Sequence, residues 1–202
     1  NEEARNFAAG FQNDPAAFNA ELTKRRIEYG RLSDDLRKWE IDLPANDPLS
    51  GLPLTSIERR VALQNRARFS DALLRTWRRE TRGSAGHMLQ ITDPILGDLP
   101  ALEADFSHVH MLSINGSART AAVDVFMQRF PGLWYLDAQN LNLPNLPQSL
   151  ASMPELRQLI LRDCGITHSA ENQAVLGSLS KLSLLDLRGN PLGMPPDVRA
   201  MP

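Results

Sequence analysis

The 202-residue chain has a single cysteine, no long apolar run and almost no net charge, and each shortage excludes a class of protein. One cysteine rules out a disulfide framework and a zinc site built from several thiolates. Because no run of about 18 apolar residues exists, no segment can span a bilayer. With 42% hydrophobic and 23% charged residues, the composition is that of an ordinary folded domain that can bury a core.

The net charge of −2 conceals an uneven distribution of charge along the chain. Residues 55–82 hold eight arginines against three acidic residues, whereas residues 83–202 hold seven basic and eleven acidic residues. A basic segment therefore precedes a mildly acidic one. The chain begins with Asn1 and ends with Met201 and Pro202, so we expect it to be an excised piece of a longer protein.

A leucine pattern recurs four times in the second half of the chain. The pattern L-x-x-L-x-L-x-x-N-x-L is matched in full from Leu182, and from Leu156 with Cys164 replacing the asparagine. It is matched more loosely from Leu133 and from Val109. The four starts are separated by 24, 23 and 26 residues, inside the range of about 20–29 residues that is typical of leucine-rich repeats.

The period predicts an α/β fold, a leucine-rich-repeat solenoid in which each unit adds one strand to a parallel sheet on the concave face. With a degenerate first unit near Gly86 we expect about five units, their strands centred near residues 89, 112, 136, 159 and 185. Leu185 and Leu187 illustrate the two positions of each unit that point inward. Prolines between the strands favour extended or turned backbone, except at 168–181, where a helix is expected.

Residues 1–82 are predicted to form an N-terminal α-helical cap, and residues 83–202 the repeat domain, whose C-terminal end we expect to be truncated. Asp14 followed by Pro15 is typical of a helix start, and this helix should run to about residue 39. Thr55 and Glu58 form a capping box that starts a second helix. We expect this helix to close the array through an apolar stripe, namely Ile57, Val61, Phe69, Leu73 and Trp77.

Side chains at the third, fifth and seventh positions of each unit should point away from the core and form the concave face. We predict that they bind a protein partner, because curvature presents them together and aromatic and arginine side chains carry much of the energy of interfaces. Alternatively, the Asp and Arg residues among them form solvated ion pairs worth at most about 1 kcal/mol each. The predicted binding residues are Met111, Ser113, Asn115, Tyr135, Asp137, Gln139, Gln158, Ile160, Arg162, Leu184, Asp186 and Arg188.

Three further features of the sequence bear on function. Trp134 either packs against a neighbouring loop or serves as an exposed anchor. His108 and His110 share a strand face, but two imidazoles alone make a poor site, so we expect neither a metal nor another cofactor. We find no nucleophile elbow, P-loop or dinucleotide-binding fingerprint, and hence no catalytic constellation.

The arginine-rich second helix has three interpretations. The first is a solvated face whose arginine stems cover apolar surface. The second is docking to an acidic domain of the parent protein or to the acidic repeats. Nucleic-acid or membrane binding comes last, because Phe69 and Trp77 lie on the stripe that the cap needs. No nucleic-acid partner is therefore expected.

Several phrases of the sequence resemble one bacterial family. They lie at 73–80, 99–109, 129–133 and 185–193, and the most specific are Asp105 to Val109 and the Trp77-Arg78 helix. The chain is similar to the middle of large proteobacterial toxins or effectors. These combine a dermonecrotic-toxin-like helical region, leucine-rich repeats and a C-terminal NEL-type, IpaH-like E3 ubiquitin ligase domain. A second resemblance is to plant-pathogen effectors that carry an N-terminal helix, repeats and an unrelated ligase domain.

The resemblance covers residues 55–202 and implies a secreted effector that acts in the host cytoplasm. Its repeats would select host target proteins through the concave face and would restrain the parent's own ligase domain. The NEL ligase takes ubiquitin on a Cys-x-Asp motif, whereas Cys164 is followed by Gly165 and Ile166, so the catalytic domain is expected outside this chain. The alternative function is a structural bridge or autoinhibitory module of a multidomain toxin with no external partner.

Overall fold

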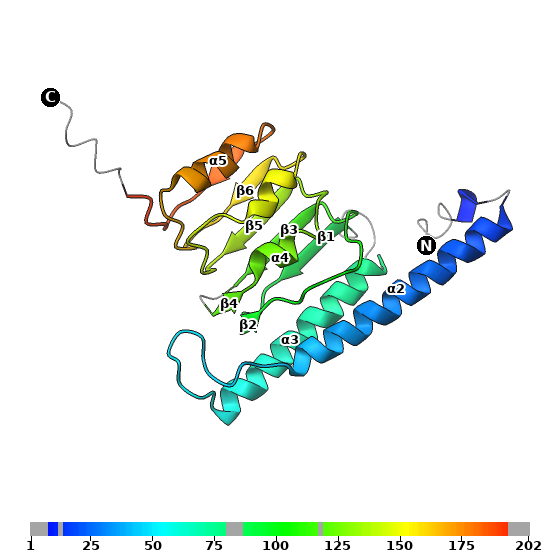
Figure 1. Ribbon diagram of the computed structural model, residues 1–202, viewed down its shortest axis with the longest axis horizontal. Coiled ribbons are helices and arrows are strands. Elements are labelled where there is room, and N and C mark those ends of the chain that lie inside the picture. The colour runs from blue at the N-terminus through cyan, green and yellow to red at the C-terminus, as the bar shows by residue number, and fades with distance from the viewer. Residues whose placement is uncertain (1–7, 12–13, 80–86, 117–118, 194–202) are drawn as a thin grey trace.

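A computed structural model describes residues 8–11, 14–79, 87–116 and 119–193 of the chain (Figure 1). Two long helices, α2 (Pro15–Ile41) and α3 (Ser56–Trp77), lie side by side at one end of the molecule. Asp14 caps α2 by accepting a hydrogen bond from the Ala17 amide at 2.8 Å. Thr55 and Glu58 form both bonds of the capping box at the start of α3. The two predicted helix starts are therefore confirmed.

The repeats form a five-stranded parallel sheet whose strands follow one another in chain order. Each predicted strand centre falls inside one of its strands, so the α/β class with a parallel sheet is confirmed. The strands are β1 (Met88–Ile91), β3 (Met111–Asn115), β5 (Tyr135–Gln139), β6 (Gln158–Ile160) and β7 (Leu184–Asp186).

Short elements connect consecutive strands of this sheet (Figure 1). The strands β2 (Gly97–Asp98) and β4 (Thr120–Ala121) pair in a second, two-stranded parallel sheet. After β4 the same connector holds α4 (Val123–Met127), and the next two connectors hold the 3-10 helix η2 (Gln148–Ser152) and α5 (Ala170–Ser178). The prediction of a helix within 168–181 is confirmed by α5.

A chain of phenylalanine rings joins the helical layer to the core of the repeats. The ring centroids of Phe69 on α3 and Phe126 on α4 lie 5.6 Å apart. Phe126 in turn lies 4.9 Å from Phe130, which lies 5.2 Å from Phe106. Because all four rings belong to one buried cluster, α3 and the first repeats share a single hydrophobic core.

The predicted apolar stripe of α3 is wrong in its first two turns. Phe69 and Leu73 are buried as expected, but Ile57 is 66% exposed and Val61 is 45% exposed. The buried positions of this half of the helix are held instead by Ala62 and by two polar side chains, Asn65 and Arg66, which bond to backbone carbonyls. The helix is therefore rotated so that polar anchors face the protein while two aliphatic side chains face water.

The last strand departs from the inward pattern of the other repeats. Leu185 takes the position that Leu136 and Leu159 fill in β5 and β6, where both are fully buried. It is nevertheless 43% exposed, while Leu187 is partly buried against the core. Leu185 therefore has the inward register that the pattern predicts but is not buried, because no described residue covers the outer side of β7.

Candidate protein-binding surface

The strand register brings the predicted binding residues together on one face of the sheet. In β3, β5 and β6 they alternate with buried side chains, which places them opposite the core. One row runs Met111, Tyr135, Gln158, Leu184, and the next runs Ser113, Asp137, Ile160, Asp186. In the third row Asn115 pairs with Gln139, and Arg162 and Arg188 follow two residues after the aligned Ile160 and Asp186.

An ion-pair cluster closes the β7 end of this face. The Asp186 carboxylate lies 2.7 Å from the Arg188 guanidinium and 2.6 Å from that of Arg162. Hydrogen bonds from Arg188 and then from Arg162 hold the pKa of Asp186 well below its usual value. The internal ion pairs that formed the alternative interpretation of this face are therefore present at this end.

The centre of the face is organised around Asp137. Its carboxylate accepts a hydrogen bond from the Tyr135 hydroxyl at 3.3 Å and another from the Gln139 amide at 2.7 Å. Burial and the neighbouring Asp137 charge raise the pKa of Tyr135, so the phenol stays neutral at physiological pH. These bonds hold an aromatic ring, a carboxylate and an amide in fixed positions on the surface, which reduces the entropy lost on binding.

The hydrogen bonds in the turn after each strand explain the role of Cys164. The Asn190 side chain accepts hydrogen bonds from the amides of Cys164 and Ile166, each at 3.0 Å, and donates to two backbone carbonyls. Cys164 takes the same position one repeat earlier, and its thiol points at the Ala138 carbonyl at 3.2 Å. Burial raises the pKa of this thiol, so Cys164 has the environment of a core residue and not of a nucleophile.

The histidines that could have suggested a metal are bonded to the backbone. His108 contacts the Thr76 carbonyl at 3.0 Å, and His110 contacts that of Gly132 at the same distance. Burial lowers the pKa of His108. Within the described ranges, no three His, Cys, Asp or Glu side chains are grouped so that they could hold a metal ion.

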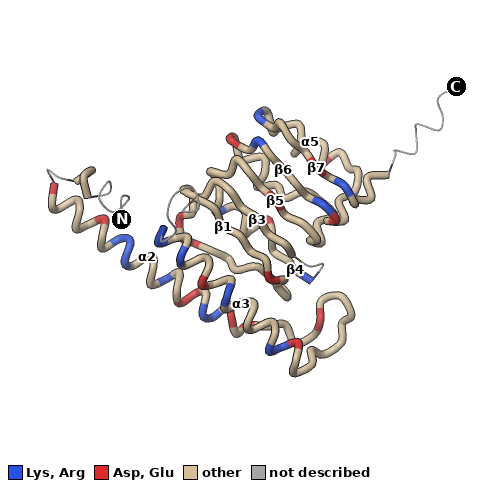
Figure 2. The backbone as a smooth tube through the Cα atoms, turned by 180° about the vertical axis from the view of Figure 1, so that it is seen from behind, with Lys and Arg blue, Asp and Glu red and all other residues tan. Residues whose placement is uncertain are grey.

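Two of the exposed arginines of α3 have acidic partners. Arg75 pairs with Asp71 at 2.9 Å, and Arg68 pairs with Asp93 at 3.3 Å. Figure 2 shows basic and acidic residues interspersed along both long helices. This arrangement agrees with the interpretation of a solvated helix face. Among the described residues, no helix has the length and apolarity needed to cross a bilayer.

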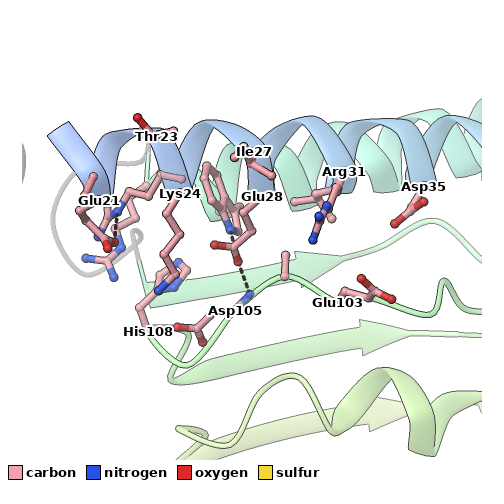
Figure 3. A pocket seen from close by; sticks show the side chains of 16 residues that line it. Glu21, Thr23, Lys24, Ile27, Glu28, Arg31, Asp35, Glu103, Asp105 and His108 are labelled. Carbon is pink, nitrogen blue, oxygen red and sulfur yellow. Dashed lines mark hydrogen bonds and ion pairs between the residues drawn. The ribbon is translucent and has the colours of Figure 1, made fainter.

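A cleft of about 680 Å³ between α2 and the segment 103–108 was not predicted (Figure 3). Glu28 of α2 reaches across it and accepts hydrogen bonds from the Asp105 amide at 2.7 Å and the Trp77 indole at 3.4 Å. The only signal in the sequence was that Trp77 and Asp105 both fall in the family phrases. Charges of both signs line the cleft, among them Lys24 and Glu103. Because Glu28 bonds to residues of α3 and of the repeats, it fastens α2 to both.

No protein-family model matches the chain, and no curated protein matches it either. Among solved structures, the chain is similar to the leucine-rich repeat domain of the type III effector XopL. The two share 19% sequence identity at a TM-score of 0.41, and the alignment covers 92% of this chain. It covers 54% of the other, so the chain spans about half the length of that structure.

Proposed function

We propose that this chain is a leucine-rich-repeat solenoid module that recognises a protein partner through the concave face of its five-stranded sheet. The observation that carries the proposal is the register of the sheet. Parallel strands in chain order align ten of the twelve predicted side chains in rows, while the residues between them in β3, β5 and β6 are buried in the core. A repeat array of this kind offers a broad surface rather than an enclosed pocket, which suits a protein.

The chemistry of the rows supports a protein partner. One row has apolar and aromatic side chains, namely Met111, Tyr135 and Leu184. In the next row the apolar Ile160 lies between the two carboxylates of Asp137 and Asp186. Aromatic and aliphatic anchors surrounded by polar groups are the composition of protein interfaces. Tyr135 is held by Asp137, which makes it the side chain best prepared to act as an anchor.

The finer proposal places this module in a secreted bacterial effector that acts on host proteins in the host cytoplasm. It rests on the phrases at 73–80, 99–109, 129–133 and 185–193 and on the resemblance they carry to NEL-type E3 ubiquitin ligases. On this proposal the module itself catalyses nothing, and the transfer of ubiquitin belongs to a domain of the parent protein.

Site-specific crosslinking tests the concave face. A photoreactive phenylalanine analogue replaces Ser113 on the face, and in a matched control it replaces the exposed Gln128 after α4. In host-cell extract we expect one protein to crosslink from position 113 and not from position 128. Tyr135→Ala and Arg162→Ala should each abolish this crosslink. Equal labelling from both positions, or a crosslink insensitive to both substitutions, would contradict the proposal.

The alternative function, a bridging or autoinhibitory module, is favoured by one observation. Asp186 already has both of its ionic partners, Arg162 and Arg188, on the same face. If this face has no external partner, the photoreactive residue at position 113 in the parent protein should crosslink only to other parts of that protein. That result would replace recognition of a host protein by an internal contact.

A further inference from the structure

A second candidate site lies at the entry of the strands, beside the concave face. His110, Trp134, Arg157 and Ser183 form a row one residue before β3, β5, β6 and β7. Backbone hydrogen bonds of 2.8–2.9 Å connect each member of the row to the next. The row lines a groove of about 620 Å³, together with Gln158 and two further residues, Gly132 and Glu155.

Trp134 gives this groove an aromatic wall with an unused donor. The indole N–H groups of Trp39 and Trp77 donate to the Asp98 carbonyl and to Glu28, at 2.8 and 3.4 Å. Trp134 is half-buried, and its indole N–H donates to no acceptor among the described residues. A tryptophan in such a position can pack an apolar group against its face and donate a hydrogen bond at its edge.

The polar side chains of the groove also have unused donors. Within the described part of the chain, the Arg157 guanidinium makes no hydrogen bond or ion pair, and the Gln158 amide makes no hydrogen bond. The one acidic residue of the lining, Glu155, is paired with Lys181. That pairing, reinforced by the charge of Arg157, lowers the pKa of Glu155. The groove therefore combines an ion-paired carboxylate with an arginine available for a ligand.

The entrance of the groove is held rigidly. His110 bonds to the Gly132 carbonyl at 3.0 Å, and the Trp134 ring lies edge-on to Tyr135 with the centroids 6.0 Å apart. A Cβ on Gly132 would lie 2.3 Å from the Ser107 carbonyl oxygen, so only glycine allows this close approach. The turn that delivers Trp134 to the groove is thus fixed before any ligand arrives.

We propose that this groove binds an acidic peptide segment, with a carboxylate on Arg157 and a neighbouring apolar side chain on the Trp134 indole. The unused guanidinium matches a carboxylate in charge and in geometry, and the tryptophan supplies the apolar contact. Among the described lining residues, Arg157 is the single arginine or lysine, too few for a nucleic-acid backbone, which requires several cations. The inference goes beyond the concave face, with which this site shares only Gln158.

Nuclear magnetic resonance of the 15N-labelled chain tests the groove. The Trp134 indole signal is assigned with Trp134→Phe, and two capped peptides are titrated: acetyl-Leu-Glu-Leu-Glu-amide and its isosteric partner acetyl-Leu-Gln-Leu-Gln-amide. We expect the acidic peptide to shift the Trp134 indole signal saturably. Binding of the amide peptide, and binding of the acidic peptide to Arg157→Gln, should each be about tenfold weaker, because each loses the charge-assisted hydrogen bonds.

Arg162→Gln on the concave face is the matched control and should leave this titration unchanged, so a failure of the groove is distinguishable from a failure of the concave face. No saturable shift with the acidic peptide, or equal affinity for both peptides, would overturn the proposal. An equal loss in Arg162→Gln would move the binding to the concave face. Inorganic phosphate is the third probe, and an affinity for it equal to that for the acidic peptide would indicate a simple anion site.

Discussion

The single residue Arg66 connects three segments of this protein. Its side chain is 1% exposed and donates to the carbonyls of Trp39, Asp42 and Leu96, while its guanidinium lies 4.5 Å from the centre of the Trp39 ring. Burial lowers the pKa of this arginine, and the charges of Asp42 and Asp98 oppose the shift. The guanidinium thereby ties the end of α2 and the segment before β2 to α3.

Replacing Arg66 should destabilise the fold strongly. In Arg66→Met the apolar stem is retained, but three backbone carbonyls each lose a hydrogen bond, and we expect a loss of about 3 kcal/mol in the free energy of unfolding. Urea denaturation measures it. The exposed Arg60 of the same helix provides the control, because Arg60→Met should change stability by less than about 0.5 kcal/mol. Equal effects of the two substitutions would show that Arg66 is not an anchor.

Asp186 gives a prediction about pH. Its lowered pKa means that the fold stabilises the ionised carboxylate, so this stabilisation is present above the usual pKa of 3.8 and is lost as the pH falls through the lowered value. In a carboxyl-carbon NMR titration we expect Asp186 to titrate below 3.8. Arg188→Gln should raise its pKa more than Arg162→Gln does, because Arg188 makes the larger contribution. A wild-type midpoint at the usual value would contradict the ion-pair cluster.

At the scale of elements, the start of α3 connects the helical layer to the repeats. Glu58 accepts hydrogen bonds from the Thr55 amide at 2.9 Å and from its hydroxyl at 2.8 Å, which lower the pKa of Glu58. Arg119, which comes from the connector after β3, pairs with Glu58 at 3.2 Å and also with Asp47 in the segment between the helices. The capping box is therefore part of a wider contact between α3 and the repeats.

Removing the cap should weaken α3 measurably. Thr55→Ala takes away the acceptor for the Glu58 amide, and we expect it to cost about 1 kcal/mol of stability. Ser56→Ala, at the next position, is the matched control and should be within about 0.5 kcal/mol of the wild type. Thermal unfolding followed by circular dichroism compares the two. If both substitutions have the same effect, the loss belongs to the general environment of the helix start and not to the cap.

At the scale of the whole molecule, the two ends of the sheet differ. The β1 end contacts α3 and shares its core, whereas at the β7 end Leu184 and Leu185 are 41% and 43% exposed. Each strand of a repeat array is stabilised chiefly by its neighbours. Opening of the sheet should therefore begin at β7 and proceed toward β1.

Hydrogen exchange followed by mass spectrometry tests this gradient. We expect the amides of β3 and β5, each paired on both sides, to exchange slowest, and those of β7 to exchange fastest among the five strands. Phe69→Ala should speed exchange in β1 and β3 more than in β6, because Phe69 joins α3 to Phe126 and the first repeats. Protection of β7 equal to that of β5 would show that the exposed leucines do not weaken this end.

Repetition explains why strand positions could be predicted. The inward leucines recur at nearly fixed spacing, and a two-residue alternation within each strand assigns its side chains to the inward side or to the opposite face of the sheet. A capping residue and a proline likewise suffice to place a helix start, as at Asp14 and Pro15. These signals are local, so they can be interpreted without knowing which distant segments pack nearby.

No local signal in the sequence predicts the contacts between segments that are distant along the chain. The rotation of α3 depends on carbonyls near residues 39–42 and 96, which Arg66 meets only in the folded chain. The groove at the strand entries depends on three repeats that bring Trp134, Arg157 and Ser183 side by side from positions 23 and 26 residues apart. Sequence spacing alone does not distinguish whether Trp134 packs against a neighbouring loop or serves as an exposed anchor.

The repeat period is therefore enough to predict the order, direction and facing of the strands, because each unit repeats the same pattern of inward leucines. Which polar side chains have hydrogen-bond partners, and which keep free donors, depends instead on contacts between distant segments. That outcome depends on whether a carbonyl or carboxylate from another segment comes within hydrogen-bond distance. Asp186 found two arginines in this way, whereas Arg157 and Trp134 found no partner among the described residues and remain available to a ligand.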